Sequence, residues 1–124
     1  MQNNKPHQQK WPSELDALLA APQHHRLLFE NEMVRVIDAR IPPGETTALH
    51  THQWPASLYI ISMSDFIRYD AEGRVTFDSR TMPIALLPSM AIWSEPIALH
   101  ALQNTGLNEL RVICVEIKKT SENH

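Results

Sequence analysis

Between residues 25 and 118 the chain is divided into short runs in which apolar and polar residues alternate, with turn-forming residues between them. An alternation with a period of two is typical of β-strands, because successive side chains of a strand point to opposite faces. The turns include Pro42-Pro43-Gly44 and Ala71-Glu72-Gly73, and the second of these predicts a hairpin. The runs interpreted as strands are 25–29, 33–41, 47–52, 57–62, 66–70, 74–78, 84–87, 91–93, 97–103 and 109–118. Short strands at near-regular spacing predict an all-β sandwich or small barrel.

The segment that precedes the first strand has a helical pattern instead. Ser13 is a typical N-cap residue, and Pro22 stops a helix, so we expect a short helix over residues 13–21. Its apolar face, which we assign to core packing or a dimer contact, consists of Leu15, Leu18 and Leu19.

The polar ends of the chain indicate how it is divided. Residues 1–11 are expected to form a flexible N-terminal arm, and residues 119–124 a polar tail. A single domain is expected over residues 12–118, with the helix at about 13–21 and the strands at about 25–118.

Composition excludes several classes of function. Lys and Arg number 11 against 14 Asp and Glu, a formal net charge of −3, so nothing favours a broadly basic nucleic-acid or membrane-surface binder. The apolar runs are too short to span a bilayer, and with no apparent targeting segment we expect a cytoplasmic protein. The single cysteine, Cys114, excludes an internal disulfide, and its apolar strand predicts a buried, inert thiol.

Seven histidines in 124 residues are the most informative count, and two of them form the pair His50-Thr51-His52. Residues i and i+2 of a strand share a face, so both imidazoles project together and supply half of a transition-metal site. His100 lies in another predicted strand and is the candidate third ligand. The alternative is that these histidines only form hydrogen bonds. The adjacent His24 and His25 point opposite ways in a strand, and we assign them to the surface or an interface.

Two segments resemble the motifs of the cupin superfamily. In the first, Gly44 is followed by five residues and then His50-Thr51-His52. In the second, Pro96 precedes His100 by four residues, and Asn104 and Thr105-Gly106 follow. The resemblance covers about residues 25–118 and is that of a small single-domain cupin. It implies a single jelly-roll β-barrel with a metal held by His50, His52 and His100.

The chain departs from the cupin pattern at the acidic ligand of the first motif. That ligand usually follows the second histidine by three or four residues, where this chain has Ala56 and Ser57. A three-histidine site remains, as in some thiol dioxygenases of the superfamily. The loss of a carboxylate favours softer cations, so we expect one divalent transition metal, namely Fe, Zn, Ni or Mn.

The strand pleat and the two motifs also suggest which residues line a pocket. Tyr59 is expected to face inward, whereas Arg68 and Arg40 are expected to be solvated at strand edges rather than to bind a substrate carboxylate. The candidate substrate-binding residues are Tyr59, Trp54, Trp93, Leu102 and Asn104. A pocket of this kind is apolar and aromatic, and it suits a small organic molecule.

Two functions follow from these expectations. The first is a metal-dependent enzyme, either an iron-dependent dioxygenase or a metal-dependent lyase or isomerase, although no residue is identified as its acid or base. The second is a non-catalytic cupin that binds or senses a small molecule with a degenerate metal site. A purely structural protein is the least favoured, because it leaves the histidines unexplained. Exposed strand edges and the habit of cupins predict a homodimer.

Overall fold

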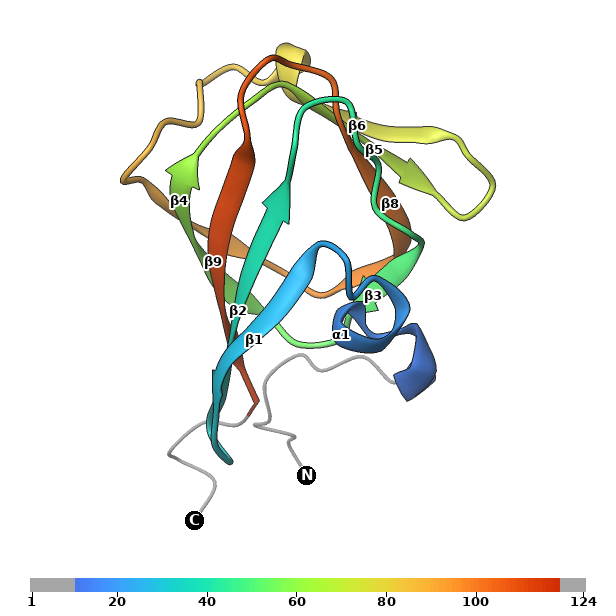
Figure 1. Ribbon diagram of the computed structural model, residues 1–124, viewed down its shortest axis with the longest axis vertical. Helices are drawn as coiled ribbons and strands as arrows, with labels where there is room; N and C mark the ends of the chain where they lie inside the picture. Colours follow the sequence, from blue (N-terminus) through green and yellow to red (C-terminus); the bar gives the residue numbers. More distant parts are fainter. Residues whose placement is uncertain (1–10, 119–124) are drawn as a thin grey trace, which may run out of the picture.

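The computed structural model describes residues 11–118, which form two antiparallel sheets that face each other (Figure 1). The first sheet has the strand order β1 (His25–Glu30), β2 (Val34–Ile41), β9 (Leu110–Ile117), β4 (Ala56–Ser62) and β7 (Ala91–Ser94). The second has the order β3 (His50–His52), β8 (Ile97–Asn104), β5 (Phe66–Asp70) and β6 (Val75–Asp78). The predicted all-β jelly-roll architecture is confirmed, but the two sheets do not close into a continuous barrel. The expected N-terminal arm and polar tail lie almost entirely outside the described residues.

Nine of the predicted runs coincide with observed strands, and one prediction is wrong. Residues 84–87 contain no strand; they follow the 3₁₀ turn η2 (Ser79–Thr81) and a proline, Pro83. Pro88 comes directly after them. Prolines lack the backbone N–H that a sheet ladder needs, so an apolar run between two prolines forms a loop.

The expected continuous helix is interrupted at Asp16. A 3₁₀ turn, η1 (Ser13–Leu15), leads to a short α-helix, α1 (Ala17–Ala20), and the backbone of Asp16 between them is extended. The Asp16 carboxylate accepts a hydrogen bond from the backbone N–H of Leu18, so Asp16 caps the helix in place of the predicted Ser13. This break also turns the Asp16 side chain toward Arg35.

The core lies between the sheets and forms two clusters. Ile37, Ala39 and Cys114 form the first, against which Leu18 packs. The second is built from Ile41, Phe66 and Leu110. The predicted burial of Cys114 is confirmed, and burial raises the pKa of its thiol to about 12, so the thiol stays protonated and inert.

Asn104, which ends β8, is fully buried and has a structural role. Its amide group donates to the carbonyl oxygens of Ile41 and Asn108, both at 2.8 Å. Its carbonyl oxygen accepts from the Ser64 hydroxyl at 2.7 Å and from the Gly106 N–H at 3.0 Å. Every polar position of this amide is therefore used to hold the turn before β9, and the expectation that Asn104 contacts a substrate is wrong.

Candidate metal centre

Four histidines converge between the two sheets. His50 and His52 come from β3, His100 from β8 and His25 from the first position of β1. The ring centroid of His50 lies 4.6 Å from that of His25, 4.9 Å from His52 and 4.4 Å from His100. The structure thus brings together His50, His52 and His100, the three predicted metal ligands. The assignment of His25 to the surface is wrong, because its side chain is buried and joins the cluster.

Backbone carbonyl groups hold three of the rings through their Nδ1 atoms. Nδ1 lies 2.9 Å from the Ala21 oxygen in His25, 2.7 Å from the Ala48 oxygen in His50, and 2.8 Å from the Ala98 oxygen in His100. A carbonyl oxygen only accepts, so Nδ1 carries the proton and Nε2 of a neutral ring keeps its lone pair. Metal-ligating histidines in proteins are held in this way.

The same three histidines are neutral at physiological pH. Burial, reinforced by the neighbouring imidazoles, lowers the pKa of His50 to about 2 and that of His100 to about 3. Burial also lowers the pKa of His25 to about 4. Neutral imidazole is the form that binds a metal, so the cluster offers lone pairs rather than protons across the neutral pH range.

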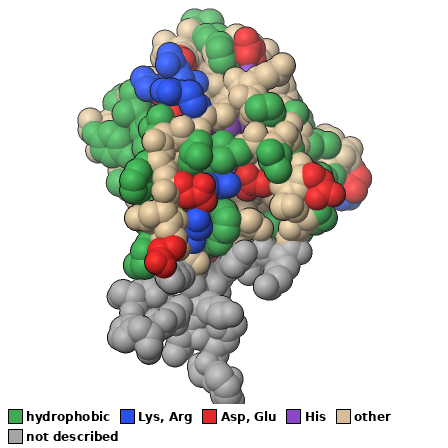
Figure 2. Space-filling view, turned by 60° about the horizontal axis from the view of Figure 1, so that its bottom comes forward, with side chains coloured by type: hydrophobic (Ala, Val, Ile, Leu, Met, Phe, Trp, Pro, Cys, Tyr) green, Lys and Arg blue, Asp and Glu red, His purple; other side chains and the backbone are tan. Residues whose placement is uncertain are grey.

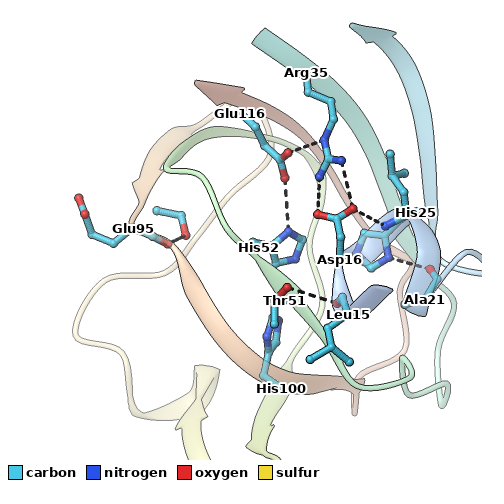
Figure 3. A network of polar contacts seen from close by, with 12 residues as sticks. Leu15, Asp16, Ala21, His25, Arg35, Thr51, His52, Glu95, His100 and Glu116 are labelled. Atoms are coloured by element: carbon cyan, nitrogen blue, oxygen red, sulfur yellow. Dashed lines mark hydrogen bonds and ion pairs between the residues drawn. The ribbon is translucent and has the colours of Figure 1, made fainter. Parts of the chain in front are cut away.

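An ion-pair network supports the fourth ring (Figure 3). Nδ1 of His52 lies 3.4 Å from a Glu116 carboxylate oxygen, a long contact. The other Glu116 oxygen accepts from Nε of Arg35 at 2.7 Å, and Arg35 also donates to both carboxylate oxygens of Asp16, at 2.8 and 3.1 Å. Burial alone lowers the pKa of Arg35, but hydrogen bonds and charges from Asp16 and Glu116 more than offset this and raise it.

The donor set and its surroundings suit a divalent transition metal. Ligand atoms of His25, His50 and His52 all lie within 4.8 Å of one another. Two nitrogens bound to one ion at about 2.0–2.1 Å and at tetrahedral angles are about 3.4 Å apart, so the most distant donor atoms need to approach by about 1.4 Å. Imidazole suits Zn, Cu, Fe and Ni. The Arg35 network sets two carboxylates against one guanidinium and so places one excess negative charge on the His52 side of the cluster. The positive charge of Arg68 lies on the His100 side.

An apolar cavity of about 100 Å³ adjoins the histidines. Its volume has room for several water molecules. Leu58, Ile97, Leu102 and Val112 contribute apolar walls, and Glu116 supplies a carboxylate. The side chain of His52 is 16% exposed, so the cluster reaches the molecular surface there. In Figure 2 only small areas of histidine are visible between the other side chains.

The predicted substrate-binding residues are placed differently from one another. Trp54 and Leu102 line the cavity. Trp93 is 56% exposed and lines a neighbouring groove. Tyr59 is 43% exposed and does not line the cavity, so the expectation that it faces inward is wrong. The inward side of β4 carries Ala56, Leu58 and Ile60.

Sequence reasoning missed the acidic group of the site, which lies on a different strand from the expected one. Ala56 faces the cavity at the position of the absent motif ligand, and Glu116 of β9 is directly opposite it in the sheet register. Glu116 also pairs in register with Arg35 of β2. A charged residue at the end of the apolar run 112–115 is a signal that the sequence offers, since burial of a charge requires a partner. Its partners, Arg35 and His52, lie 81 and 64 residues away along the chain and are not visible in the sequence.

None of the helices within residues 11–118 has the length and hydropathy required to cross a bilayer.

Comparisons with known proteins identify the fold. No protein-family model and no curated protein matches the chain. A cupin domain from Bordetella pertussis Tohama I is similar in structure, with a TM-score of 0.61 and 23% identity over 76% of this chain and 91% of that one. An RmlC-like cupin family protein with a double-stranded β-helix fold from Methanocaldococcus jannaschii has a TM-score of 0.55 and 15% identity over 77% and 79%. The polyketide cyclase RemF from Streptomyces resistomycificus has a TM-score of 0.52 and 17% identity over 81% and 68%. The chain therefore has the cupin fold.

Proposed function

We propose that this protein binds one divalent transition metal ion through His25, His50, His52 and His100 and holds a small organic molecule beside it. The first three histidines form the core of the ligand set, because their donor atoms already lie within 4.8 Å of one another. His100 completes it from the neighbouring strand, with its ring 4.4 Å from that of His50. The identity of the ion is left to measurement among Fe, Zn, Ni and Mn.

The observation that carries this proposal is the way in which the rings are held. Three of the four donate Nδ1–H to a backbone carbonyl group, and the fourth faces a carboxylate. Histidines that only fill a core have no reason to bring three donor nitrogens within 4.8 Å of one another. A metal ion relieves that crowding of lone pairs.

The proposed chemistry is that of a metal-dependent enzyme. A bound ion supplies Lewis acidity or, if it is iron, redox chemistry. The chain supplies an apolar cavity that excludes bulk water and binds the body of the organic molecule. Glu116 acts as a positioning residue, because one of its oxygens orients His52 while Arg35 holds the other.

A non-catalytic binding function is the second candidate, and one feature of the cavity favours it. Glu116 is the single carboxylate lining the cavity within residues 11–118, and it is already engaged by Arg35 and His52. An enzyme that needs a free general acid or base would therefore have to obtain it from the substrate or from bound water. Turnover of candidate substrates by metal-loaded protein, compared with binding alone, separates the two functions.

Metal content tests the proposal directly. Protein expressed without a histidine tag and purified without a chelator or a metal column should contain about one metal ion per chain. His25→Gln, His50→Gln and His52→Gln should each abolish stoichiometric uptake, and His100→Gln should weaken it. An absence of metal, with no rise in melting temperature when each ion is added, would contradict the proposal, since a ligand of the folded state must stabilise it.

His24→Gln is the matched control for His25→Gln. His24 and His25 are adjacent in sequence and equally buried, each at 7% exposure. The ring of His24 contacts Glu45 through Nε2 at 2.8 Å and is not in the donor group. Metal uptake should survive the change at His24 and not the change at His25, with circular dichroism confirming that both variants fold.

We further propose that two copies of the chain associate. β1 and β7 are the edges of the five-stranded sheet, and β1 exposes Leu27, Leu28 and Phe29. An unpaired apolar edge strand is a ready template for pairing with another chain. Light scattering coupled to gel filtration should give the mass of a homodimer, and Leu28→Lys should reduce it to that of a monomer.

A further inference from the structure

The cavity beside the histidines contains a cation that the proposed metal site does not use. Arg68 lies in β5 directly opposite Leu102 of β8, two residues from His100 on the same strand. It lines the histidine cavity together with His100 and Leu102. Its positive charge is close enough to contribute to the lowered pKa of His100, after burial and the charge of His52. The expectation that Arg68 is a solvated strand-edge residue is therefore wrong.

Arg68 differs from the other arginines because it has no anionic partner. Within residues 11–118, every other arginine has a carboxylate oxygen within 3.9 Å or less; they are Arg26, Arg35, Arg40, Arg74, Arg80 and Arg111. The Nε atom of Arg68 is buried and has no hydrogen-bond partner among the described residues. Its guanidinium lies 5.7 Å from the ring centroid of Phe77, a contact that orients it without neutralising it. Burial lowers the pKa of Arg68, because the charged guanidinium loses hydration without gaining an anionic partner.

Arg68 is also positioned where a ligand can enter. A groove of about 530 Å³ on the surface shares Arg68, His100, Leu58, Ser94 and Ile97 with the histidine cavity. Arg68 therefore lies at the junction of the open groove and the enclosed cavity.

The acidic residues of the groove are engaged by other groups. Asp70 accepts from Nε of Arg74 at 2.9 Å. Glu95 accepts from the indole N–H of Trp93 at 2.6 Å. Neither forms a hydrogen bond or ion pair with Arg68 within the described part of the chain, so the guanidinium of Arg68 remains available to a ligand.

We propose that Arg68 binds the carboxylate of a small organic acid whose apolar body lies in the histidine cavity. A guanidinium presents a planar fork that matches a carboxylate with two parallel hydrogen bonds. The apolar body then packs against Leu58, Ile97 and Leu102, and the opposite end of the molecule reaches the histidines. The role of that opposite end rests on the proposed function, whereas the binding of the carboxylate does not.

The charge and size of the cavity favour a monocarboxylate over a phosphate ester or a sugar. Arg68 is the single Lys or Arg that lines the cavity within residues 11–118, so a phosphate dianion would be left half neutralised. The remaining walls are mostly aliphatic and offer few partners for the hydroxyl groups of a sugar. A monocarboxylate with an apolar body matches both the single positive charge and the aliphatic walls.

Calorimetric titration of chelator-treated, full-length protein tests the inference without any metal. The probes are butyrate and benzoate, each compared with its uncharged amide, butyramide and benzamide. A charge-assisted hydrogen bond contributes roughly 1.5–3 kcal/mol, so each acid should bind about tenfold or more tightly than its amide. In parallel, the Nε–H resonance of Arg68, identified by its loss in Arg68→Met, should shift with benzoate and not with benzamide.

Three variants assign the preference for acids to the Arg68 fork. Arg68→Met keeps the apolar stem and should abolish the preference, while Arg68→Lys keeps the charge without the fork and should retain only part of it. Arg40→Met is the matched control, because Arg40 is exposed, lies in β2 and pairs with Glu109 away from the cavity. The control should bind the acids as the wild type does.

The outcomes separate this inference from the proposed metal site. Equal affinity for acid and amide, an unchanged preference in Arg68→Met, or no binding and no resonance shift with either acid would each overturn the carboxylate site. Arg68→Met should still take up metal as the wild type does. If the wild type takes up no metal and yet shows an Arg68-dependent preference for acids, the metal proposal fails and the carboxylate site stands. If metal binds but the preference for acids is absent, the carboxylate site fails and the metal proposal stands.

Discussion

Two arginines adjoin the histidine cavity, and they differ in whether the chain supplies their counterions. Arg35 is buried between Asp16 and Glu116, donates to both carboxylates and lies 4.9 Å from the ring centroid of Trp54. Arg68 faces the same cavity with its Nε unpartnered among the described residues. A cation whose partners come from the fold stabilises the fold and orients what touches it. A buried cation without a partner lowers the stability of the fold, and its presence in the cavity points to a ligand.

The largest effect that tests this contrast is expected from Arg35→Met. The change leaves Asp16 and Glu116 buried without a counterion, and breaking such a pair costs about 3–5 kcal/mol of unfolding free energy. Urea denaturation in the presence of a chelator measures this loss without a contribution from metal. A loss below about 1 kcal/mol, as for an exposed pair, would mean that Arg35 is not the structural member of the two.

Counted for each titrating histidine, acid should have the next largest effect on stability. The folded-state pKa values of His25, His50 and His100 are about 4, 2 and 3, against 6.5 for the free side chain. Below pH 6.5 the histidines of the unfolded chain bind protons, whereas those of the folded chain stay neutral. The full contribution to the unfolding free energy is therefore present above pH 6.5 and is lost as the pH falls. Each pH unit costs about 1.4 kcal/mol per histidine, or about 2 kcal/mol at about pH 5.

Urea midpoints measured without metal at neutral pH and at about pH 5 check this slope. Replacing His25 by Gln removes one titrating group and should flatten the slope. A slope that is the same in the variant and the wild type would show that other groups govern the acid sensitivity.

The effect of Glu116→Gln on metal binding should be smaller. The amide removes a negative charge from beside His52, and changes of this kind typically cost 10–100-fold in metal affinity, or about 1.4–2.7 kcal/mol. Competition with a chromophoric chelator measures the affinity. Glu109→Gln, at a half-buried carboxylate just before the same strand and paired with Arg40, is the control and should leave the affinity unchanged.

The smallest expected effect is that of Arg68→Met on stability, and its contrast with Arg35→Met is the sharpest form of the comparison. Removing an unpaired cation relieves a desolvation cost but loses the contact with Phe77. The two should nearly cancel, so that the unfolding free energy changes by less than about 1 kcal/mol. A loss as large as that of Arg35→Met would show that Arg68 is structural after all.

Much of the site could be predicted because strand periodicity is a local property. The i, i+2 spacing of His50 and His52 places both rings on one face, and the structure shows their centroids 4.9 Å apart. The same periodicity failed for Tyr59. The prediction placed Tyr59 inward, whereas the strand turns Ala56 and Leu58 toward the cavity. A strand read one residue out of phase exchanges its two faces.

His25 and Glu116 lay beyond local reasoning. His25 was assigned to a surface pair, and its ring lies 4.6 Å from that of His50 because β1 begins beside the second sheet. Glu116 meets Arg35 because β2 and β9 pair in one register, and it meets His52 because the two sheets face each other. The Asp16 contact needs the break between η1 and α1, which a continuous helical pattern conceals.

The sequence by itself determined the all-β architecture, nearly all of the strands and three of the four clustered histidines, since alternation and turn residues act over a few positions. Only the tertiary structure decided which charges have partners. Arg35 and Arg68 both sit in alternating apolar strands and look alike in the sequence. Counterions reach Arg35 from residues 19 and 81 positions away, and none reaches Arg68 within the described residues, because strand register and sheet packing set contacts that no local pattern encodes.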